Sequence, residues 1–469
     1  MKTKPNSSSP LQRAGVVASA TIATLLGLPV NAATTSFPQY PLMTGGSTIP
    51  PNILLILDDS GSMGYLKMPV DETTLEDEVS DRSYINNTIY YNPAVTYRPW
   101  RTASVDLNDR LPAANFKAAA SNRTSSTDDL VDLRTATAED ENGNYVPESY
   151  FYVPKPGISN PGTTSGNYDK YRIASSTSST SYGGGVVQKR DRVTVIGSTT
   201  IGSIASGTWS ECVVVNTDDA EDVTIKTSGG SGDGDLYVYY KRGDCSGDYL
   251  KSESNKNDES VTISSPRATM SFRIFGYKNT TNISYVVTGI GWVDMTPSGN
   301  TSALQQAELQ NFANWYQYHR TRNKMAKAGA SEAFGRLGES YRVGFDTIWN
   351  RGGSNRNTSG SVPALPIDYL TDGGLFKGAN RTVFYSRLHN AGASNGTPLH
   401  GALQRAGRYF GTNDPWKDSN GSMVTCRQNY AILTTDGYWN SRDDDNSGYS
   451  SVGNTDSSSN RDVDGNPPQ

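Results

Sequence analysis

The sequence contains few of the residues on which zinc proteins, metalloproteases and nucleic-acid-binding proteins depend. Only three histidines and three cysteines occur among the 469 residues, and neither a CxxC pair nor an HExxH helix is present. A zinc site and a metalloprotease helix are therefore not expected. The formal net charge is −5 and charged residues make up only 19% of the chain. This balance leaves no basic field for nucleic acid, which we do not expect as a partner.

Long hydrophobic runs are absent after residue 32. Before that point, three basic residues within the first 13 are followed by a small, apolar stretch, 14–30, that ends in "VNA" at Ala32. This order predicts a signal peptide over residues 1–32 that is cleaved on export. The alternative is a membrane anchor, for which the stretch is short and rich in Ala, Thr and Gly. We expect an exported mature chain without a membrane span.

Export would permit disulfide bonds between the few cysteines. Cys212 and Cys245 fall in one β-rich segment and could pair. Cys426 is then left over, either buried and reduced or paired with a thiol outside this chain.

Glycine, serine, threonine, asparagine and tyrosine are abundant, as in extracellular proteins with many loops. Residues 67–205 carry no sustained periodicity, and we expect a long irregular insertion there. Residues 206–290 hold six short β-branched and aromatic runs separated by Gly- and Asp-rich turns. This spacing predicts a small inserted β-sandwich.

The remaining segments alternate between strand and helix patterns. "ILLIL" and "YRVGFDTI" read as buried strands, and "NYAILTTDG" as a third. A helix pattern runs over 304–338, and a second one follows Thr397 in "TPLHGALQRAGRYF". This order predicts an α/β domain with a parallel sheet covered on both faces, made of residues 33–205 and 291–469.

Oxygen-bearing side chains follow two of these strands and begin one helix. Asp58, Ser60 and Ser62 leave the first strand, Asp436 follows the last one, and Thr397 stands at the helix start. Ligands of open parallel sheets bind beyond the carboxyl ends of the strands. We therefore expect these five residues to bind one hard cation, Mg²⁺ or Ca²⁺. Because neutral hydroxyls dominate the set, the cation would still attract a carboxylate from a partner.

The D-x-S-x-S stretch, the downstream threonine and the T-D-G turn resemble the metal-ion-dependent adhesion site of von Willebrand factor A domains. The segments "PNILLILDDSGSM", "YYNPAVTYRPW", "GTPLHGALQRAGRYF" and "CRQNYAILTTDGYWN" resemble the N-terminal half of PilY-type adhesins of bacterial type IV pili. The resemblance covers about 51–100 and 295–440. It implies a von Willebrand A-type domain with Asp58, Ser60, Ser62, Thr397 and Asp436 as metal ligands.

The same resemblance implies a metal-dependent adhesin and assembly factor at the pilus tip or the cell surface. Minor pilins and a host or surface molecule that presents a carboxylate would be its partners. It also implies a C-terminal propeller-like domain and further strands after "YAILTTDG", which this sequence does not include. On that expectation the strand before Asp436 becomes an exposed sheet edge.

Within residues 206–290, the stretches "TIKTSGGSGDGDLYVYYKRG" and "ESVTISSPRATMSFRIFGY" resemble bacterial pre-peptidase C-terminal domains, the small β-sandwiches commonly appended to secreted proteases. Two hypotheses follow for this insertion: it gates partner binding at the metal, or it is an inert spacer. Deleting the segment and measuring ligand binding separates them.

Two other functions compete with metal-dependent adhesion. One is a secreted, protease-associated protein; however, "GASNG" lacks the preceding strand that a nucleophilic serine needs, and no triad is evident. We therefore do not expect an enzyme. The other is a pilus-priming structural factor whose metal site is dispensable. The basic run "HRTRNKMAK" is interpreted as a solvated helix face.

Overall fold

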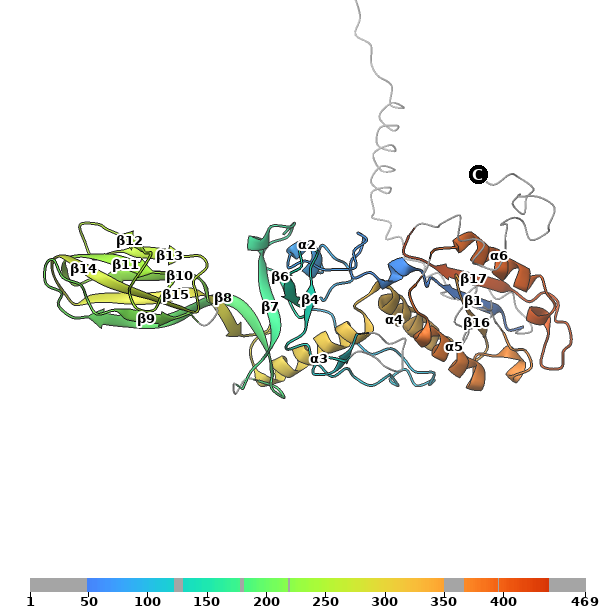
Figure 1. Ribbon diagram of the computed structural model, residues 1–469. Coiled ribbons are helices and arrows are strands. Elements are labelled where there is room, and N and C mark those ends of the chain that lie inside the picture. The colour runs from blue at the N-terminus through green and yellow to red at the C-terminus, as the bar shows by residue number, and fades with distance from the viewer. Residues whose placement is uncertain are drawn as a thin grey trace, which may run out of the picture. The chain divides into compact units, whose positions relative to one another are not determined.

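The computed structural model describes residues 49–121, 130–177, 181–217, 220–349, 367–394 and 396–437 (Figure 1). All elements below belong to one compact unit, Pro50–Gln469. The predicted signal peptide lies outside the described residues. Within the described ranges, no helix combines the length and the apolar character that crossing a membrane requires.

Three of the predicted strands form one parallel sheet in the order β16-β1-β17. Their bounds are β1 (Asn52–Leu57), β16 (Arg342–Thr347) and β17 (Asn429–Thr434). Leu57 at the end of β1 lies opposite Thr347 on one side and Thr434 on the other. The carboxyl ends of all three strands therefore meet at one edge. The order also reverses around β1, which is the point where open α/β sheets bind ligands.

Helices cover both faces of this sheet, and Figure 1 shows α6 on one side and α4 and α5 on the other. They are α4 (Arg322–Gly335), α5 (Gly378–Asn390) and α6 (Leu399–Phe410). Because side chains alternate along a strand, Leu55 and Leu57 pack with the aromatic residues of α4 and α5. Leu54 and Ile56 pack on the other face, against α6. The unbroken apolar run of β1 thus reflects a strand buried on both faces.

The helix pattern over 304–338 forms two helices instead of one. After α3 (Ser302–Tyr318) the helix ends, and α4 starts anew at Arg322. The hydroxyl of Thr321 accepts a hydrogen bond from Lys324 N at 3.2 Å and caps the second helix. The break lets the two halves bury their apolar stripes in different cores.

The first stripe packs against the segment for which we expected only irregular structure. Leu309, Phe312 and Tyr316 of α3 share a core with aromatic residues from residues 90–171. Tyr91 lies at the centre, with its ring 4.8 Å from Phe312 and 5.1 Å from Phe151. The segment therefore forms a hydrophobic core together with α3. It also contains short elements: α2 (Val79–Arg82), β2 (Ala119–Ala120), β3 (Leu130–Val131), β4 (Thr137–Glu139), β5 (Tyr145–Pro147), β6 (Phe151–Pro154) and β7 (Tyr168–Ser175).

Each of the six runs predicted as strands in 206–290 forms a strand, and the sheets there are antiparallel. Two sheets result, with the orders β13-β10-β15-β8-β7-β6 and β12-β11-β14-β9, and three strands of the first sheet, β6, β7 and β8, come from residues before 206. The strands not yet given are β8 (Gly185–Ile201), β9 (Val213–Asn216), β10 (Glu221–Ser228), β11 (Ser231–Tyr239), β12 (Leu250–Ser252), β13 (Ser260–Ile263), β14 (Thr269–Thr281) and β15 (Ile283–Asp294). The protein as a whole is mixed α/β, as expected, but most of its sheets are antiparallel.

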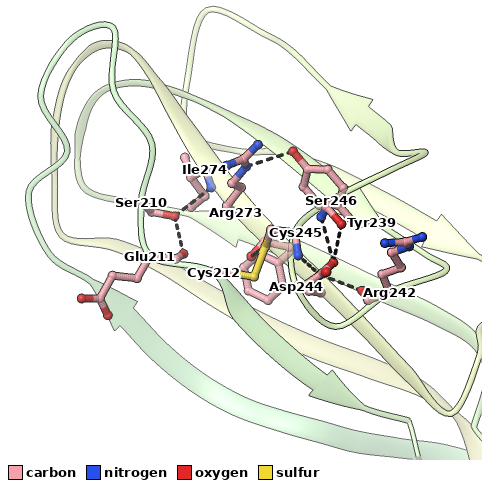
Figure 2. The surroundings of a disulfide bond; sticks show 12 residues. Ser210, Glu211, Cys212, Tyr239, Arg242, Asp244, Cys245, Ser246, Arg273 and Ile274 are labelled. Atoms are coloured by element: carbon pink, nitrogen blue, oxygen red, sulfur yellow. Dashed lines mark hydrogen bonds between the residues drawn. A yellow bond between two sulfur atoms is a disulfide. The ribbon is translucent and has the colours of Figure 1, made fainter.

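A disulfide joins Cys212 and Cys245, as the shared segment predicted (Figure 2). It links the residue before β9 to the turn that follows β11. Cys245 has a positive φ of 55°, and its N–H donates to Ser271 Oγ at 2.9 Å. Of the two alternatives for Cys426, the buried thiol is wrong, because this cysteine is free and exposed.

Removing this disulfide should destabilise the protein. The bond closes a loop between cysteines 33 residues apart, and replacing both with serine frees that loop in the unfolded chain. We expect the free energy of unfolding to fall by about 2–4 kcal/mol, measured by urea denaturation. Cys426→Ser is the matched control and should leave it nearly unchanged. Equal stability of all three proteins would contradict the prediction.

A buried lysine on α4 should make stability depend on pH. Lys327 is 1% exposed, its ammonium donates to the carbonyl of His389 at 3.1 Å, and burial lowers its pKa to about 7. In the unfolded chain the pKa returns to about 10.4. Between the two values the unfolded chain binds more protons, so raising the pH through this window stabilises the fold.

Lys327→Met lacks this titration. We therefore expect the free energy of unfolding of Lys327→Met, relative to wild type, to be highest near pH 7 and to fall towards about pH 10. Urea unfolding of both proteins across that range measures the difference, in which other titrations cancel. Parallel pH profiles would contradict the prediction.

Candidate metal centre

The loop that leaves β1 brings three of the five predicted ligands together. Asp58 is fully buried, and its Oδ1 accepts the backbone N–H of Ser60 at 2.8 Å. The chain then turns into a short 3₁₀ helix, Gly61–Gly64. This turn places Ser60 Oγ 3.1 Å from Ser62 Oγ. Two hydroxyls and one carboxylate thus lie at the carboxyl end of the central strand.

The loop after β17 adds a fourth predicted ligand. Asp436 Oδ1 accepts a hydrogen bond from Ser62 Oγ at 3.0 Å, although the two residues are 374 positions apart. Thr435 Oγ1 donates to Asp58 Oδ2 at 2.7 Å. Hydrogen bonds therefore connect Asp58, Ser60, Ser62 and Asp436 around one site.

Thr397 belongs to the loop that leads into α6. It is buried, and its carbonyl accepts the N–H of Leu399 at 3.0 Å. The contacts that join this loop to the sheet edge run through its neighbours. Ser394 N donates to the carbonyl of Asp59 at 2.8 Å, and Trp349 Nε1 donates to the carbonyl of Gly396 at 2.5 Å. The Thr397 loop is thus attached to the β1 loop and to the end of β16.

Burial makes the Asp58 carboxylate costly to keep charged. It raises the pKa of Asp58, hydrogen bonds from Ser60 and Thr435 lower it, and the nearby charge of Asp436 raises it further. The net shift is upward. A cation between the two carboxylates would offset both the burial and the repulsion.

Arg322 is a residue of this site that sequence reasoning missed. Its guanidinium, 5% exposed, donates to Asp436 Oδ2 at 2.8 Å and to Asp71 Oδ1 at 2.8 Å. Arg322, Lys324 and Lys327 are all buried, so reading this basic run as a solvated face was wrong. Spacing gives no sign of these contacts, because the partners of Arg322 lie far away in sequence.

Thr435 was missed as well, although it stands beside Asp436 in the "TTDG" turn. Its hydroxyl holds the second oxygen of Asp58. The Asp59 carboxylate accepts the N–H of Trp349 at 3.3 Å. It therefore helps to join the ends of β1 and β16.

The oxygen atoms gathered at this site are of the kind that hard cations bind. Asp436 Oδ1, the two serine hydroxyls and the Asp58 carboxylate are all oxygens, as Mg²⁺ and Ca²⁺ prefer. Within the described part of the chain, no group of three or more His, Cys, Asp or Glu side chains is arranged for a metal. Any cation here would thus rely on two carboxylates and on hydroxyls, which leaves much of its charge for a further ligand.

The curated proteins to which this chain is similar are type IV pilus biogenesis factors. No family model matches the chain. The type IV pilus biogenesis factor PilY1 of Pseudomonas aeruginosa strain PAO1 is 34% identical over 184 residues, 35% of this chain and 15% of that protein. The PilY1 of strain PAK is 37% identical over 160 residues, 33% of this chain and 13% of that protein.

The match to a solved structure of infectious bursal disease virus strain Gx covers 41% of this chain and 48% of the viral chain, at 12% identity. Its TM-score is 0.07, so we draw no conclusion from it. The chain spans only 15% of the first PilY1 relative and 13% of the second. About a third of this protein is therefore similar to a type IV pilus biogenesis factor.

Proposed function

We propose that this protein is a metal-dependent adhesin and assembly factor of type IV pili. The similarity to PilY1 supports the pilus assignment. The observation that carries the metal dependence is the contact between Ser62 and Asp436, which joins the β1 loop to the β17 loop at 3.0 Å. On this proposal the chain is exported and acts at the pilus tip or the cell surface.

The fold proposed for the site is a von Willebrand A-type domain. Support comes from the parallel order β16-β1-β17, from helices on both faces, and from polar loops at the carboxyl ends of the strands. Ile432 of β17 is 44% exposed, as expected of a strand at the edge of this sheet.

The proposed ligands of Mg²⁺ or Ca²⁺ are Asp58, Ser60, Ser62, Thr397 and Asp436. When bound, the cation supplies a positive centre to which a partner carboxylate attaches. The protein's own residues prepare the site: Thr435 and the N–H of Ser60 fix the Asp58 carboxylate, and Arg322 fixes that of Asp436. The proposed partners are minor pilins, or a host or surface molecule that presents a carboxylate.

Binding to purified minor pilins tests this proposal. Wild-type protein should be retained on immobilised minor pilins with Mg²⁺ or Ca²⁺ and released by EDTA, whereas Asp58→Ala should not be retained. Scoring piliation and adhesion separately in cells that carry the variant distinguishes an adhesin from a priming factor whose metal is dispensable. If EDTA does not release the wild-type protein and Asp58→Ala is retained equally well, binding does not depend on the metal and this part of the proposal is wrong. Casein hydrolysis by the purified protein would instead favour a protease-associated role.

A further inference from the structure

The β-sandwich has a shallow cavity of about 480 Å³, open to solvent, that combines carboxylates with aromatic rings. Three carboxylates and three rings of its lining matter here: Asp233, Asp235, Glu253, Tyr237, Phe275 and Tyr277. They come from β11, β14 and the segment that follows β12. The cavity uses none of the residues of the candidate metal centre.

A buried carboxylate oxygen in the lining of this cavity, and two further buried oxygens outside the lining, lack a hydrogen-bond donor. Asp233 lines the cavity and is 2% exposed, yet its Oδ1 has no hydrogen-bond partner among the described residues. The same holds for Asn257 Oδ1 and Glu259 Oε1, both buried. All three atoms can only accept hydrogen bonds. Since an unsatisfied buried acceptor is costly, the arrangement favours a ligand that donates hydrogen bonds.

The charges around the cavity are also unbalanced. Asp235 interacts electrostatically with the carboxylates of Glu253, Asp233 and Glu259. Two lysines oppose these four carboxylates: Lys251 lies 2.7 Å from Glu253, and Lys278 lies 3.6 Å from Asp233. Burial, followed by the three neighbouring carboxylates, raises the pKa of Asp235 to about 6, and Lys251 partly offsets this. The cavity therefore gains from an added positive charge.

The aromatic lining favours an organic cation. Rings attract ammonium and guanidinium groups through their negative faces. The protein already uses this chemistry nearby, because the Lys251 ammonium lies 5.8 Å from the centre of the Tyr237 ring while it pairs with Glu253. Tyr277 is 63% exposed and stands where an incoming side chain would meet it.

We propose that this cavity binds a positively charged side chain, arginine or lysine, of a partner protein. The guanidinium or ammonium would donate hydrogen bonds to Asp233 and pair with Asp235 and Glu253, with its apolar stem against the rings. The β-sandwich would then be a binding module in its own right, independent of the metal.

Calorimetric titration of the full chain with a short probe peptide tests this inference. The probe is acetyl-Gly-Arg-Gly-amide, and its neutral twin carries citrulline in place of arginine. We expect the arginine peptide to bind about tenfold more tightly than the citrulline peptide. Binding should weaken as the pH falls below about 6, because protonation of Asp235 removes one of the attracting charges.

Two variants and one control make the result specific. Asp235→Asn and Tyr277→Ala should each weaken the arginine peptide by about fivefold or more, and the exposed tyrosine can be removed without disturbing a core. Glu221→Gln, which removes a carboxylate on β10 outside the cavity, should leave the affinity unchanged. Equal binding of both peptides, or no effect of either variant, would overturn the proposal. So would Ca²⁺ binding that depends on Asp235 and excludes the peptide, since the cavity would then be a metal site.

Discussion

On the proposed function, Mg²⁺ or Ca²⁺ should stabilise the wild-type protein against heat, and alanine at Asp436 should abolish that stabilisation. Asp436 links the β17 loop to Ser62, and it is one of the two carboxylates among the proposed ligands. A cation at a hundred times its dissociation constant stabilises a folded protein by about 2.7 kcal/mol. Differential scanning calorimetry with cation and with EDTA measures the gain for each protein. Wild type should show it, and the variant should not.

The comparison needs care because Asp436 also pairs with Arg322. Loss of that pair lowers stability with or without metal, so the relevant quantity is the difference between the two conditions. Asp71→Ala is the matched control. Asp71 is the other carboxylate partner of Arg322, its side chain is 67% exposed, and its removal leaves the proposed ligands intact. This control should keep the cation effect. A cation effect retained in Asp436→Ala would count against the proposed site.

Alanine at Asp346 should destabilise the α/β domain by about 3–5 kcal/mol. Asp346 on β16 is 1% exposed, and its Oδ2 lies 3.0 Å from Arg405 Nε and 2.9 Å from Arg405 Nη2. Arg405 on α6 is itself buried and also donates to the carbonyl of Thr347 at 2.6 Å. Removing the carboxylate leaves the guanidinium buried without its counter-charge. Urea unfolding measures the loss.

A double variant distinguishes the lost pair from lost packing. Asp346→Leu with Arg405→Met replaces both charges by apolar groups, and such replacements often restore stability. We expect the double variant to be more stable than Asp346→Ala. Glu221→Ala, which breaks the pair between Arg190 and a glutamate that is 67% exposed, should cost at most about 1 kcal/mol. If Asp346→Ala cost no more than this control, the buried pair would not hold α6 on the sheet.

The three strands of the parallel sheet and six strands of the β-sandwich could be predicted from short-range pattern alone, whereas β2–β8 and β12 were not predicted. The apolar run of β1 and the β-branched runs of the sandwich carry their own signal, because burial on one or both faces sets the spacing of apolar residues. The candidate site followed from the same logic. Once β1 and β17 are strands, Asp58 and Asp436 stand at their ends, and parallel pairing brings those ends together.

The helices show where pattern alone is insufficient. α5 was not predicted, since its sequence "GANRTVFYSRLHN" is largely polar and its helix depends on burying Phe384, Tyr385 and Leu388 against β16 and α4. The break before Arg322 was missed because apolar spacing continues on both sides of it. Arg322 and Thr435 were missed for a related reason: their roles are set by partners that only the fold brings near.

A crystal of the full chain soaked in Mn²⁺ tests the central claim most directly. Mn²⁺ favours the same oxygen ligands as Mg²⁺ and is located by its anomalous scattering. The account predicts one strong peak within coordination distance of oxygens of the β1 loop, the β17 loop and Thr397. A crystal with no peak there, or with a peak that contacts only one of these loops, would contradict it.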